Sequence, residues 1–290
     1  MKDINIEVIK PKIKLALTDL GTHIDSRVED AINNAIFEET QSIAKDVLQT
    51  MLDNYRIARS ENIPVCQDTG SVVFLLELGE ELCFKNSLIN LLHECVSEVW
   101  KEHQYRDSIV KDPVFHRNIT KNNSPAIIHT ELVKGDDTTI YIALKGGGAE
   151  NMSALKMLNP SDGREGIKKF IIDTVLLASG NACPPIIIGV GVGGNFEQVA
   201  YLSKKALFRE LQSTNSDKEW AAFEQEILTD VNELGIGPQG LGGKTTALAV
   251  HIETAPCHIA SLPVAVNLQC HAHRITKIVL QDSDYDYFVM

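Results

Sequence analysis

The sequence has no long apolar run and no segment that resembles a signal peptide. Its longest apolar stretch, residues 184–192, is far shorter than the roughly 20 residues that a helix needs to span a bilayer. Residues 1–19 interleave lysines with single apolar residues, whereas a signal peptide has a continuous apolar segment. These absences argue against a membrane-spanning or secreted protein. We therefore expect a cytoplasmic protein with no membrane partner.

Positive charge is also scarce. The chain has 27 lysines and arginines against 39 aspartates and glutamates, a formal net charge of -12. Proteins that bind nucleic acid usually present a basic face to the phosphates, so we expect no nucleic-acid partner. The remaining composition, 44% hydrophobic and 23% charged in 290 residues, is typical of a soluble globular protein of one large domain or two ordinary ones.

Cysteine is too sparse for a disulfide framework. Six cysteines without a secretory signal leave three roles, namely buried thiol, metal ligand and nucleophile. Cys83 and Cys95 fall at the start of a predicted helix and within it, so we expect them to be packing residues. Cys66, Cys183 and Cys270 instead lie in loops at the edges of apolar strands. Their separations of 117 and 87 residues match no short zinc motif, so spacing alone does not establish a metal site.

Helical periodicity marks the N-terminal part of the chain. Residues 27–62 place apolar side chains at three- and four-residue steps without Pro or Gly, which is typical of amphipathic helices. We therefore expect a helical region that ends before Pro64. Further helices are predicted near residues 85–103, 166–178 and 218–234.

Strands are indicated by short runs rich in β-branched and aromatic residues. SVVFLLELG, residues 71–79, predicts one strand. AIIHTEL and TTIYIALKG, residues 126–132 and 138–146, predict a hairpin joined across residues 134–137. Two or three more short strands are expected near the C-terminus. The mixture predicts an α/β class, or mixed α+β, in which a helical N-terminal region is followed by mixed sheets flanked by helices.

One glycine pattern resembles a nucleotide-binding turn. Gly189, Gly191 and Gly194 spell G-x-G-x-x-G after an apolar run, as in dinucleotide-binding folds. Such a fold begins with this unit and repeats strand and helix after it, whereas here the later part is mostly short strands. A plain strand-to-helix turn is therefore the alternative.

Two further glycine-rich loops raise the same question. GIGPQGLGGKTTA misses the pattern G-x-x-x-x-G-K-[ST] by one residue, because Pro238 stands where the first glycine belongs, although its backbone amides and Lys244 remain candidates to hold an anion. The triple glycine at residues 146–148 is either a tight turn or a close approach to a ligand. Several such loops in one chain indicate a small anionic ligand.

Four segments together resemble one enzyme family. PVCQDTG, GGGAENMSALKML, GNACPPIIIGVGVGG and LGIGPQGLGGKTTALAVHIETAPCHIASLPVAVNLQCHAHR are similar to the alpha subunits of class I iron–sulfur fumarate hydratase and of its relative L(+)-tartrate dehydratase, over about residues 27–274. The resemblance implies a class I fumarase N-terminal-type fold. It also implies a [4Fe-4S] cluster held by Cys66, Cys183 and Cys270, in which one iron lacks a cysteine ligand and is open to substrate. Cys257 is left out, because the family often has another residue in that segment.

The resemblance further implies which residues contact the substrate. Asp68 and His258 are expected to be catalytic, and Gln67, Arg106 and Gly147 are expected to bind the substrate, for which arginine's planar fork suits a carboxylate. Plainer alternatives are a turn for the aspartate, a surface charge for the arginine and a structural hydrogen bond for the histidine. Three residues near the last cysteine are candidates to tune the cluster and are given no catalytic role: His271, His273 and Arg274.

The implied reaction is the loss of water from a 2-hydroxy dicarboxylate. It requires a base for a weakly acidic C–H proton and a Lewis acid for the hydroxide that leaves. GGGAENMSAL and GLGGKTTALAVHIETAP look closer to fumarase versions, which implies reversible hydration of fumarate to (S)-malate, with L(+)-tartrate dehydration as the alternative. Two rival classes remain open, a nucleotide-binding enzyme and a non-catalytic iron–sulfur scaffold or sensor.

The resemblance also implies a partner. Single-chain members of the family continue into a second domain, whereas this chain ends at Met290. We therefore expect one iron–sulfur hydro-lyase alpha domain over residues 1–290, with a helical N-terminal region at 1–62 and a cluster-bearing core at 63–290. A separately encoded beta subunit, which would carry the catalytic base, is expected to complete an α2β2 assembly.

Overall fold

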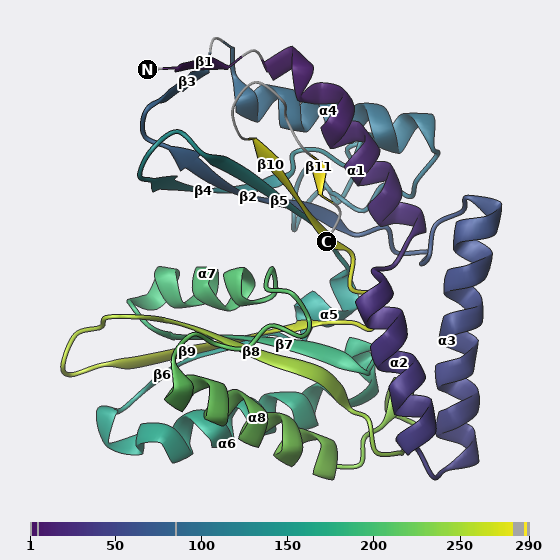
Figure 1. Cartoon of the computed structure of the whole chain (residues 1–290), viewed down its shortest axis with the longest axis vertical. Coiled ribbons are helices and arrows are strands. Elements are labelled where there is room, and N and C mark those ends of the chain that lie inside the picture. The colour runs from purple at the N-terminus through teal and green to yellow at the C-terminus, as the bar shows by residue number, and fades with distance from the viewer. Residues whose placement is uncertain (1, 5, 85, 281–286, 289–290) are drawn as a thin grey trace. The chain divides into compact units, whose positions relative to one another are not determined.

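A computed structural model describes residues 2–4, 6–84, 86–280 and 287–288 of the chain, which divides into two units (Figure 1). Unit 1 consists of Met1–Ile24, Tyr55–Gly146 and Arg274–Met290, and unit 2 of Asp25–Asn54 and Gly147–His273. The division falls inside one long helix, α3 (Ser42–Glu61). Helices and mixed sheets occur together, which confirms the predicted fold class. The predicted hydro-lyase domain over residues 1–290 stays a prediction.

Unit 1 is built on two sheets. Its elements are β1 (Lys2–Ile4), η1 (Ile6–Val8), α1 (Lys10–Thr22), β2 (Ser71–Gly79), β3 (Leu82–Phe84), α4 (Leu88–Glu102), β4 (Ile127–Val133), β5 (Thr138–Lys145), β10 (Ile275–Leu280) and β11 (Tyr287–Phe288). The larger sheet has the strand order β11-β10-β5-β2-β4, and β1 pairs in parallel with β3. Helices α1 and α4 cover one face of the larger sheet (Figure 1). Their apolar sides form its core, in which Leu17, Phe74 and Trp100 are buried.

The position of β2 corrects the predicted hairpin. Both predicted strands form, as β4 and β5, but β2 lies between them, parallel to β4 and antiparallel to β5. The residues of β2 from 72 to 76 are all buried, as expected of a strand with a neighbour on each side. β4 is exposed or half-buried along its whole length, as expected of an edge strand. A parallel pair needs a long crossover, which α4 supplies between β2 and β4.

Unit 2 contains a four-stranded sheet covered by helices on both faces. Its elements are α2 (Ser26–Glu38), α5 (Gly147–Asn151), β6 (Ala154–Leu158), η2 (Pro160–Asp162), α6 (Gly163–Ala178), η3 (Ser179–Ala182), β7 (Ile186–Gly193), α7 (Phe196–Ala206), α8 (Lys218–Glu233), η4 (Pro238–Gly240), β8 (Ala247–Ala255) and β9 (Leu262–Gln269). The strand order is β6-β9-β7-β8, with β7 parallel to β8 and antiparallel to β9. Helix α7 covers one face, and α6 and α8 cover the other (Figure 1).

Two glycines of the G-x-G-x-x-G pattern lie inside β7, where α7 packs on it. A Cβ atom on Gly189 would collide with the carbonyl oxygen of Ser203, and one on Gly191 would collide with that of Val199. Only glycine therefore allows the helix backbone to approach the strand this closely. The structure gives both glycines a packing role, which is the plainer of the two interpretations of the pattern.

Most predicted helices form, and one cysteine prediction is wrong. Helices α2, α3, α6 and α8 occupy the segments with helical periodicity. Helix α4 begins at Leu88, after the N-cap Ser87, and the predicted first residue, Lys85, lies outside the described residues. Because residues 82–84 form the short strand β3 instead, Cys83 is exposed, whereas Cys95 is buried as predicted. No helix in the described part of the chain is both long and apolar enough to cross a membrane.

Candidate functional site

The loop at residues 63–70, which follows α3, carries the first predicted site residues in unit 1. The backbone N–H of Asp68 donates to Sγ of Cys66 over 3.4 Å, and the Asp68 carboxylate accepts from the N–H of Gly70 over 3.0 Å. The second bond closes a turn at residues 68–70, which is the structural alternative to a catalytic role for Asp68. Cys66 and Asp68 are half-buried, and Gln67 is exposed. This loop therefore presents a thiol, an amide and a carboxylate in succession.

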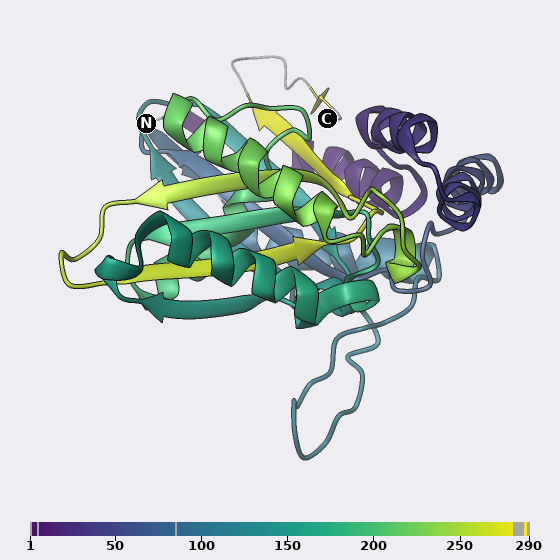
Figure 2. The same cartoon turned by 90° about the horizontal axis from the view of Figure 1, so that it is seen from below.

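Arg106 has a fixed backbone and an exposed side chain. Its carbonyl oxygen accepts from Oγ1 of Thr69 over 2.8 Å and from Nε1 of Trp100 over 3.3 Å. The first bond holds Arg106 next to the 63–70 loop. The segment that follows is a projecting loop, in which an isolated bridge joins Val110 to Ile119 (Figure 2). The side chain of Arg106 is thus exposed, while its backbone is held in a defined position.

Cys183 and Cys270 lie at the same edge of the unit 2 sheet. Cys183 precedes β7 and Cys270 follows β9, and these strands are antiparallel. The backbone N–H of His271 donates to the carbonyl oxygen of Cys183 over 3.2 Å, which joins the two loops. Cys183 has a φ of 55°, in the left-handed region that non-glycine residues rarely adopt. We call this end of the sheet, with Cys183 and Cys270, the cysteine edge.

The loop GIGPQGLGGK supports the segment around Cys183. The N–H of Gln239 donates to the carbonyl oxygen of Pro184 over 2.8 Å. Gly240 packs against Gly180, because a Cβ atom on Gly240 would lie 2.7 Å from Cα of Gly180. The loop that carries Cys183 and the loop GIGPQGLGGK therefore meet at the cysteine edge, backbone against backbone.

The end of the same loop binds a carboxylate of the protein itself. The N–H of Lys244 donates to Glu39 over 2.6 Å, and the N–H groups of Thr40 and Gln41 also donate to Glu39. Burial raises the pKa of Glu39, but these backbone donors outweigh it, so the pKa lies below its usual value. The Lys244 amide that was a candidate to hold an anion is thus occupied by a side chain between α2 and α3.

Gly147 opens α5 at the cysteine edge. Its neighbour Gly148 lies close to η3, since a Cβ atom there would lie 3.3 Å from the carbonyl oxygen of Asn181. Because η3 leads directly into Cys183, the unit 2 part of the triple glycine belongs to the same group of loops as Cys183 and Cys270. Gly147 itself is exposed.

An ion pair that the sequence did not reveal anchors α5. Nζ of Lys204, on α7, lies 2.7 Å and 2.6 Å from the two carboxylate oxygens of Glu150, and Nδ2 of Asn267 donates to Glu150 over 3.1 Å. Burial lowers the pKa of Lys204, although the charge of Glu150 opposes this shift. The three residues come from three elements far apart in the sequence, so no local pattern announces them.

His258 lies at the opposite end of the unit 2 sheet. It stands in the turn from β8 to β9, whereas Cys270 follows β9, which has eight residues. At about 3.3 Å per residue, the strand separates this turn from the cysteine edge by roughly 25 Å. The exposed ring accepts the N–H of Ala260 at Nδ1 over 3.1 Å, so the neutral ring carries its proton at Nε2. Unit 2 therefore does not bring His258 together with its own Cys183 and Cys270.

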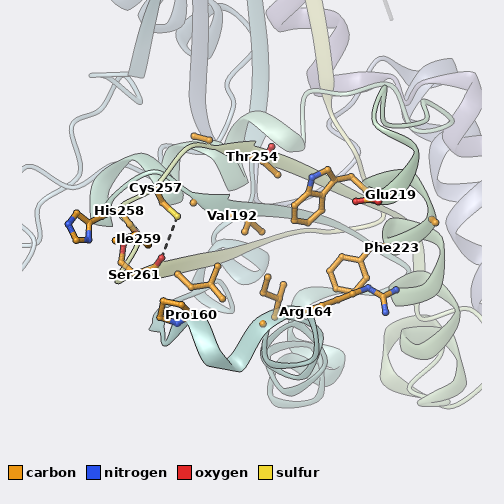
Figure 3. A pocket seen from close by; sticks show the side chains of 17 residues that line it. Pro160, Arg164, Val192, Glu219, Phe223, Thr254, Cys257, His258, Ile259 and Ser261 are labelled. Carbon is orange, nitrogen blue, oxygen red and sulfur yellow. Dashed lines mark hydrogen bonds between the residues drawn. The ribbon is translucent and has the colours of Figure 1, made fainter.

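An apolar pocket of about 820 Å³ lies at this opposite end (Figure 3). It opens between the first turns of α6 and α8 at the carboxyl ends of β7 and β8, and its walls include Trp220 and Phe223. The guanidinium carbon of Arg164 lies 4.5 Å from the centre of the Phe223 ring. Cys257 is tied by its thiol to the carbonyl oxygen of Ser261, and the ring of His258 points away from the other labelled side chains (Figure 3).

The cysteines differ in environment. Cys66, Cys183 and Cys270 are half-buried thiols outside any disulfide, the first in unit 1 and the others in unit 2. Burial raises the pKa of Cys95 to about 12, which makes that thiol inert. Within the described residues, no group of three or more His, Cys, Asp or Glu side chains is placed to hold a metal ion. The predicted cluster ligands are therefore found as a pair in one unit and a single thiol in the other.

Known proteins match most of the chain. A family model described as fumarate hydratase (Fumerase) matches residues 10–279. A protein of Methanocaldococcus jannaschii, provisionally named L(+)-tartrate dehydratase subunit alpha, is 41% identical over 263 residues, which cover 88% of this chain and 92% of that protein. The L(+)-tartrate dehydratase subunits alpha of Escherichia coli K12 and Shigella boydii serotype 4 are each 34% identical over 257 residues, which cover 88% of this chain and 85% of theirs. The matched family segment includes every predicted site residue.

Proposed function

This chain belongs to the fumarate hydratase (Fumerase) family, and we propose that it is the cluster-bearing alpha subunit of a [4Fe-4S] hydro-lyase. Membership confirms the family and the hydro-lyase class that the sequence predicted. One observation carries the proposal beyond the class: Cys183 and Cys270, 87 residues apart in the sequence, lie together at the cysteine edge as half-buried thiols outside any disulfide.

The residues present fit an iron–sulfur cluster in their chemistry. We propose Cys66, Cys183 and Cys270 as its thiolate ligands, since thiolates are the ligands such clusters take. The N–H of Asp68 already donates to Sγ of Cys66, which orients that sulfur in the loop. Three ligands leave one iron without a cysteine. When bound, the cluster would act as a Lewis acid on the hydroxyl group that leaves.

The remaining predicted residues are proposed to hold the dianionic substrate. The exposed guanidinium of Arg106 would bind a carboxylate from a backbone that Thr69 and Trp100 hold in place. Gln67 and the exposed backbone of Gly147 would donate hydrogen bonds. Asp68 would orient the substrate by accepting a hydrogen bond from its hydroxyl group at the carboxylate oxygen that faces Gly146, while its other oxygen accepts from the N–H of Gly70.

His258 requires a different arrangement. Because it lies at the far end of the unit 2 sheet from Cys183 and Cys270, we propose that it acts in the site of another copy of the chain. Its Nε2–H is available as a donor there, since Nδ1 accepts from Ala260. This arrangement agrees with the proposed α2β2 assembly, in which two alpha chains are present.

The substrate is proposed to be a 2-hydroxy dicarboxylate. The description of the matching family favours fumarate and (S)-malate, the pair expected from the sequence. The names of the relatives at 34–41% identity favour L(+)-tartrate, which yields oxaloacetate and water, and this alternative is at least as well supported. The relatives are named subunit alpha, which supports a separately encoded beta subunit. The location that we propose is the cytoplasm.

The test is anaerobic reconstitution of the full chain with iron and sulfide, followed by assay with its beta subunit. We expect bound iron and sulfide and the broad visible absorption of an iron–sulfur cluster. Cys183→Ser should abolish this absorption, and Cys83→Ser, which removes an exposed thiol, should not. The ratio of (S)-malate to L(+)-tartrate turnover then assigns the substrate. A cluster without turnover of either would instead support the non-catalytic scaffold.

A further inference from the structure

Arg274 carries a buried positive charge that its neighbours do not neutralise. Its side chain is only 1% exposed. Nη2 donates to the backbone carbonyl oxygen of Asp68 over 3.0 Å, whereas Nε and Nη1 have no hydrogen-bond partner among the described residues. A guanidinium does not lose its proton in a folded protein. Burying such a charge without a neighbouring anion is strongly unfavourable, so we expect an anion to bind beside Arg274.

No carboxylate among the described residues of unit 1 pairs directly with Arg274. The charge of Arg274 also acts on Tyr105, but burial raises the pKa of Tyr105 to about 12, so its hydroxyl is neutral. That hydroxyl donates to the carbonyl oxygen of Thr18 over 3.4 Å. Within the part of the chain that the structure describes, Arg274 forms no ion pair with a carboxylate.

The guanidinium and the Asp68 carboxylate face one small space over Gly146. A Cβ atom added to Gly146 would lie 3.5 Å from Oδ2 of Asp68 and 3.9 Å from Nη2 of Arg274. Both distances are ordinary van der Waals contacts, so the absence of a side chain at Gly146 leaves a space open beside both groups. The space is thus bordered by a cation, a carboxylate and bare backbone, and Asp68 follows Cys66 by two residues.

We propose that Arg274 binds a carboxylate group of the dicarboxylate substrate, an inference that rests on the proposed function. A guanidinium donates to the two oxygens of a carboxylate through two neighbouring N–H groups, and Nη1 with the second N–H of Nη2 forms such a pair. The other N–H of Nη2 holds the backbone of Asp68, which fixes the catalytic carboxylate relative to the bound substrate. The exposed Arg106 and the buried Arg274 would then serve the two negative charges of one dianion.

The test compares variants of the full chain in the cluster-loaded complex with its beta subunit. Arg274→Met removes the charge, and Arg274→Lys keeps the charge but loses the fork. Arg209→Met is the matched control, since Arg209 is also largely buried but is paired with Glu224 at 2.6 Å. Each complex is assayed with (S)-malate and L(+)-tartrate, and its melting temperature is measured without ligand and with each diacid, with sodium chloride at matched ionic strength as the reference.

For Arg274→Met we expect KM to rise about 10- to 100-fold, the range of a charge-assisted hydrogen bond, with a smaller change in kcat. Arg274→Lys should lie between this variant and the wild type, and Arg209→Met should keep the wild-type KM. Without ligand, Arg209→Met should lower the melting temperature clearly, because it leaves Glu224 buried and unpaired, whereas Arg274→Met should not. If Arg274→Met does not assemble, Arg274→Lys takes its place in every comparison.

Two results would overturn the inference. The first is a wild-type KM in Arg274→Met, and the second is a ligand-free melting temperature lowered as much as in Arg209→Met, which would make Arg274 a structural residue. If the wild-type complex turns over neither diacid, the proposed function fails. Arg274 is then judged by the melting temperatures alone, and an equal diacid-induced rise in wild type and Arg274→Met, or no rise in either, refutes its role.

Discussion

The packing of α7 on β7 predicts that Gly191→Ala destabilises the chain strongly. The new Cβ atom would collide with the carbonyl oxygen of Val199 and would lie 2.8 Å from N of Ser203 and 3.0 Å from Cβ of Leu202. None of these atoms is the far end of a flexible side chain. The helix as a whole must therefore move away from the strand, and the buried contacts between them loosen.

The structure sets the size of the effect. Overpacking a core costs about 1–3 kcal/mol, and the rigid neighbours of Gly191 place this variant near 3 kcal/mol. For a domain of this size, that corresponds to a melting temperature lower by roughly 6–12 °C. The control is Gly235→Ala, where φ is 66° and no atom lies within 4 Å of the added Cβ, so only backbone strain of about 1 kcal/mol remains.

The assay is urea unfolding followed by far-ultraviolet circular dichroism, with titration by NAD and ATP alongside. A packing role requires that Gly191→Ala lose about three times as much stability as Gly235→Ala, and that the wild type bind neither nucleotide. A phosphate-binding role requires the reverse pattern, in which Gly191→Ala folds normally and loses nucleotide binding. That second pattern would refute our interpretation of the glycine motif.

Three further predictions follow from burial and topology. Burial, and then the charge of Arg209, lowers the pKa of His251 from 6.5 to about 4, so only the unfolded chain takes up this proton in mild acid. The free energy of unfolding should therefore fall by about 2 kcal/mol between about pH 7 and pH 5. In urea titrations at these pH values, His251→Gln should remove this part of the pH dependence. In the folded chain Cys95 should resist iodoacetamide while Cys83 reacts, and equal labelling by peptide mass spectrometry would contradict the burial. Mixed complexes of His258→Ala and Cys183→Ser chains should recover about a quarter of the wild-type sites if His258 acts across copies, and none if it acts within its own chain.

The local elements could be predicted well because their signals are local. The run at residues 71–79 is continuous and apolar, and it forms the buried strand β2. The periodic segments near residues 166–178 and 218–234 form α6 and α8. The pairing of the strands could not be predicted in the same way. β4 and β5 look like a hairpin in the sequence, but a buried strand from earlier in the chain takes the place between them, and only the tertiary structure decides this.

The candidate site could be predicted only through long motifs. Separations of 117 and 87 residues between Cys66, Cys183 and Cys270 carry no geometric information of their own. The antiparallel arrangement of β7 and β9 is what brings two of these cysteines to one edge. The same arrangement sends His258 to the other end, although it is closer to Cys270 in the sequence than Cys183 is. The motifs therefore indicate which residues are candidates for a functional role, but neither the motifs nor the sequence separations indicate which of these residues share a site.

The glycine-rich loops could be recognised in the sequence, but their contacts could not. A glycine in a motif indicates that something approaches the backbone closely, but the sequence does not identify the approaching group. At Gly191 that group is the backbone of α7, and at Gly243 it is the carboxylate of Glu39. At Gly146 a Cβ atom would meet nothing closer than 3.5 Å, so packing within unit 1 does not require a glycine there. The missing side chain instead leaves open the space that borders the Asp68 carboxylate and the Arg274 guanidinium. A glycine at this position is therefore explained by the approach of a ligand and not by packing within the protein.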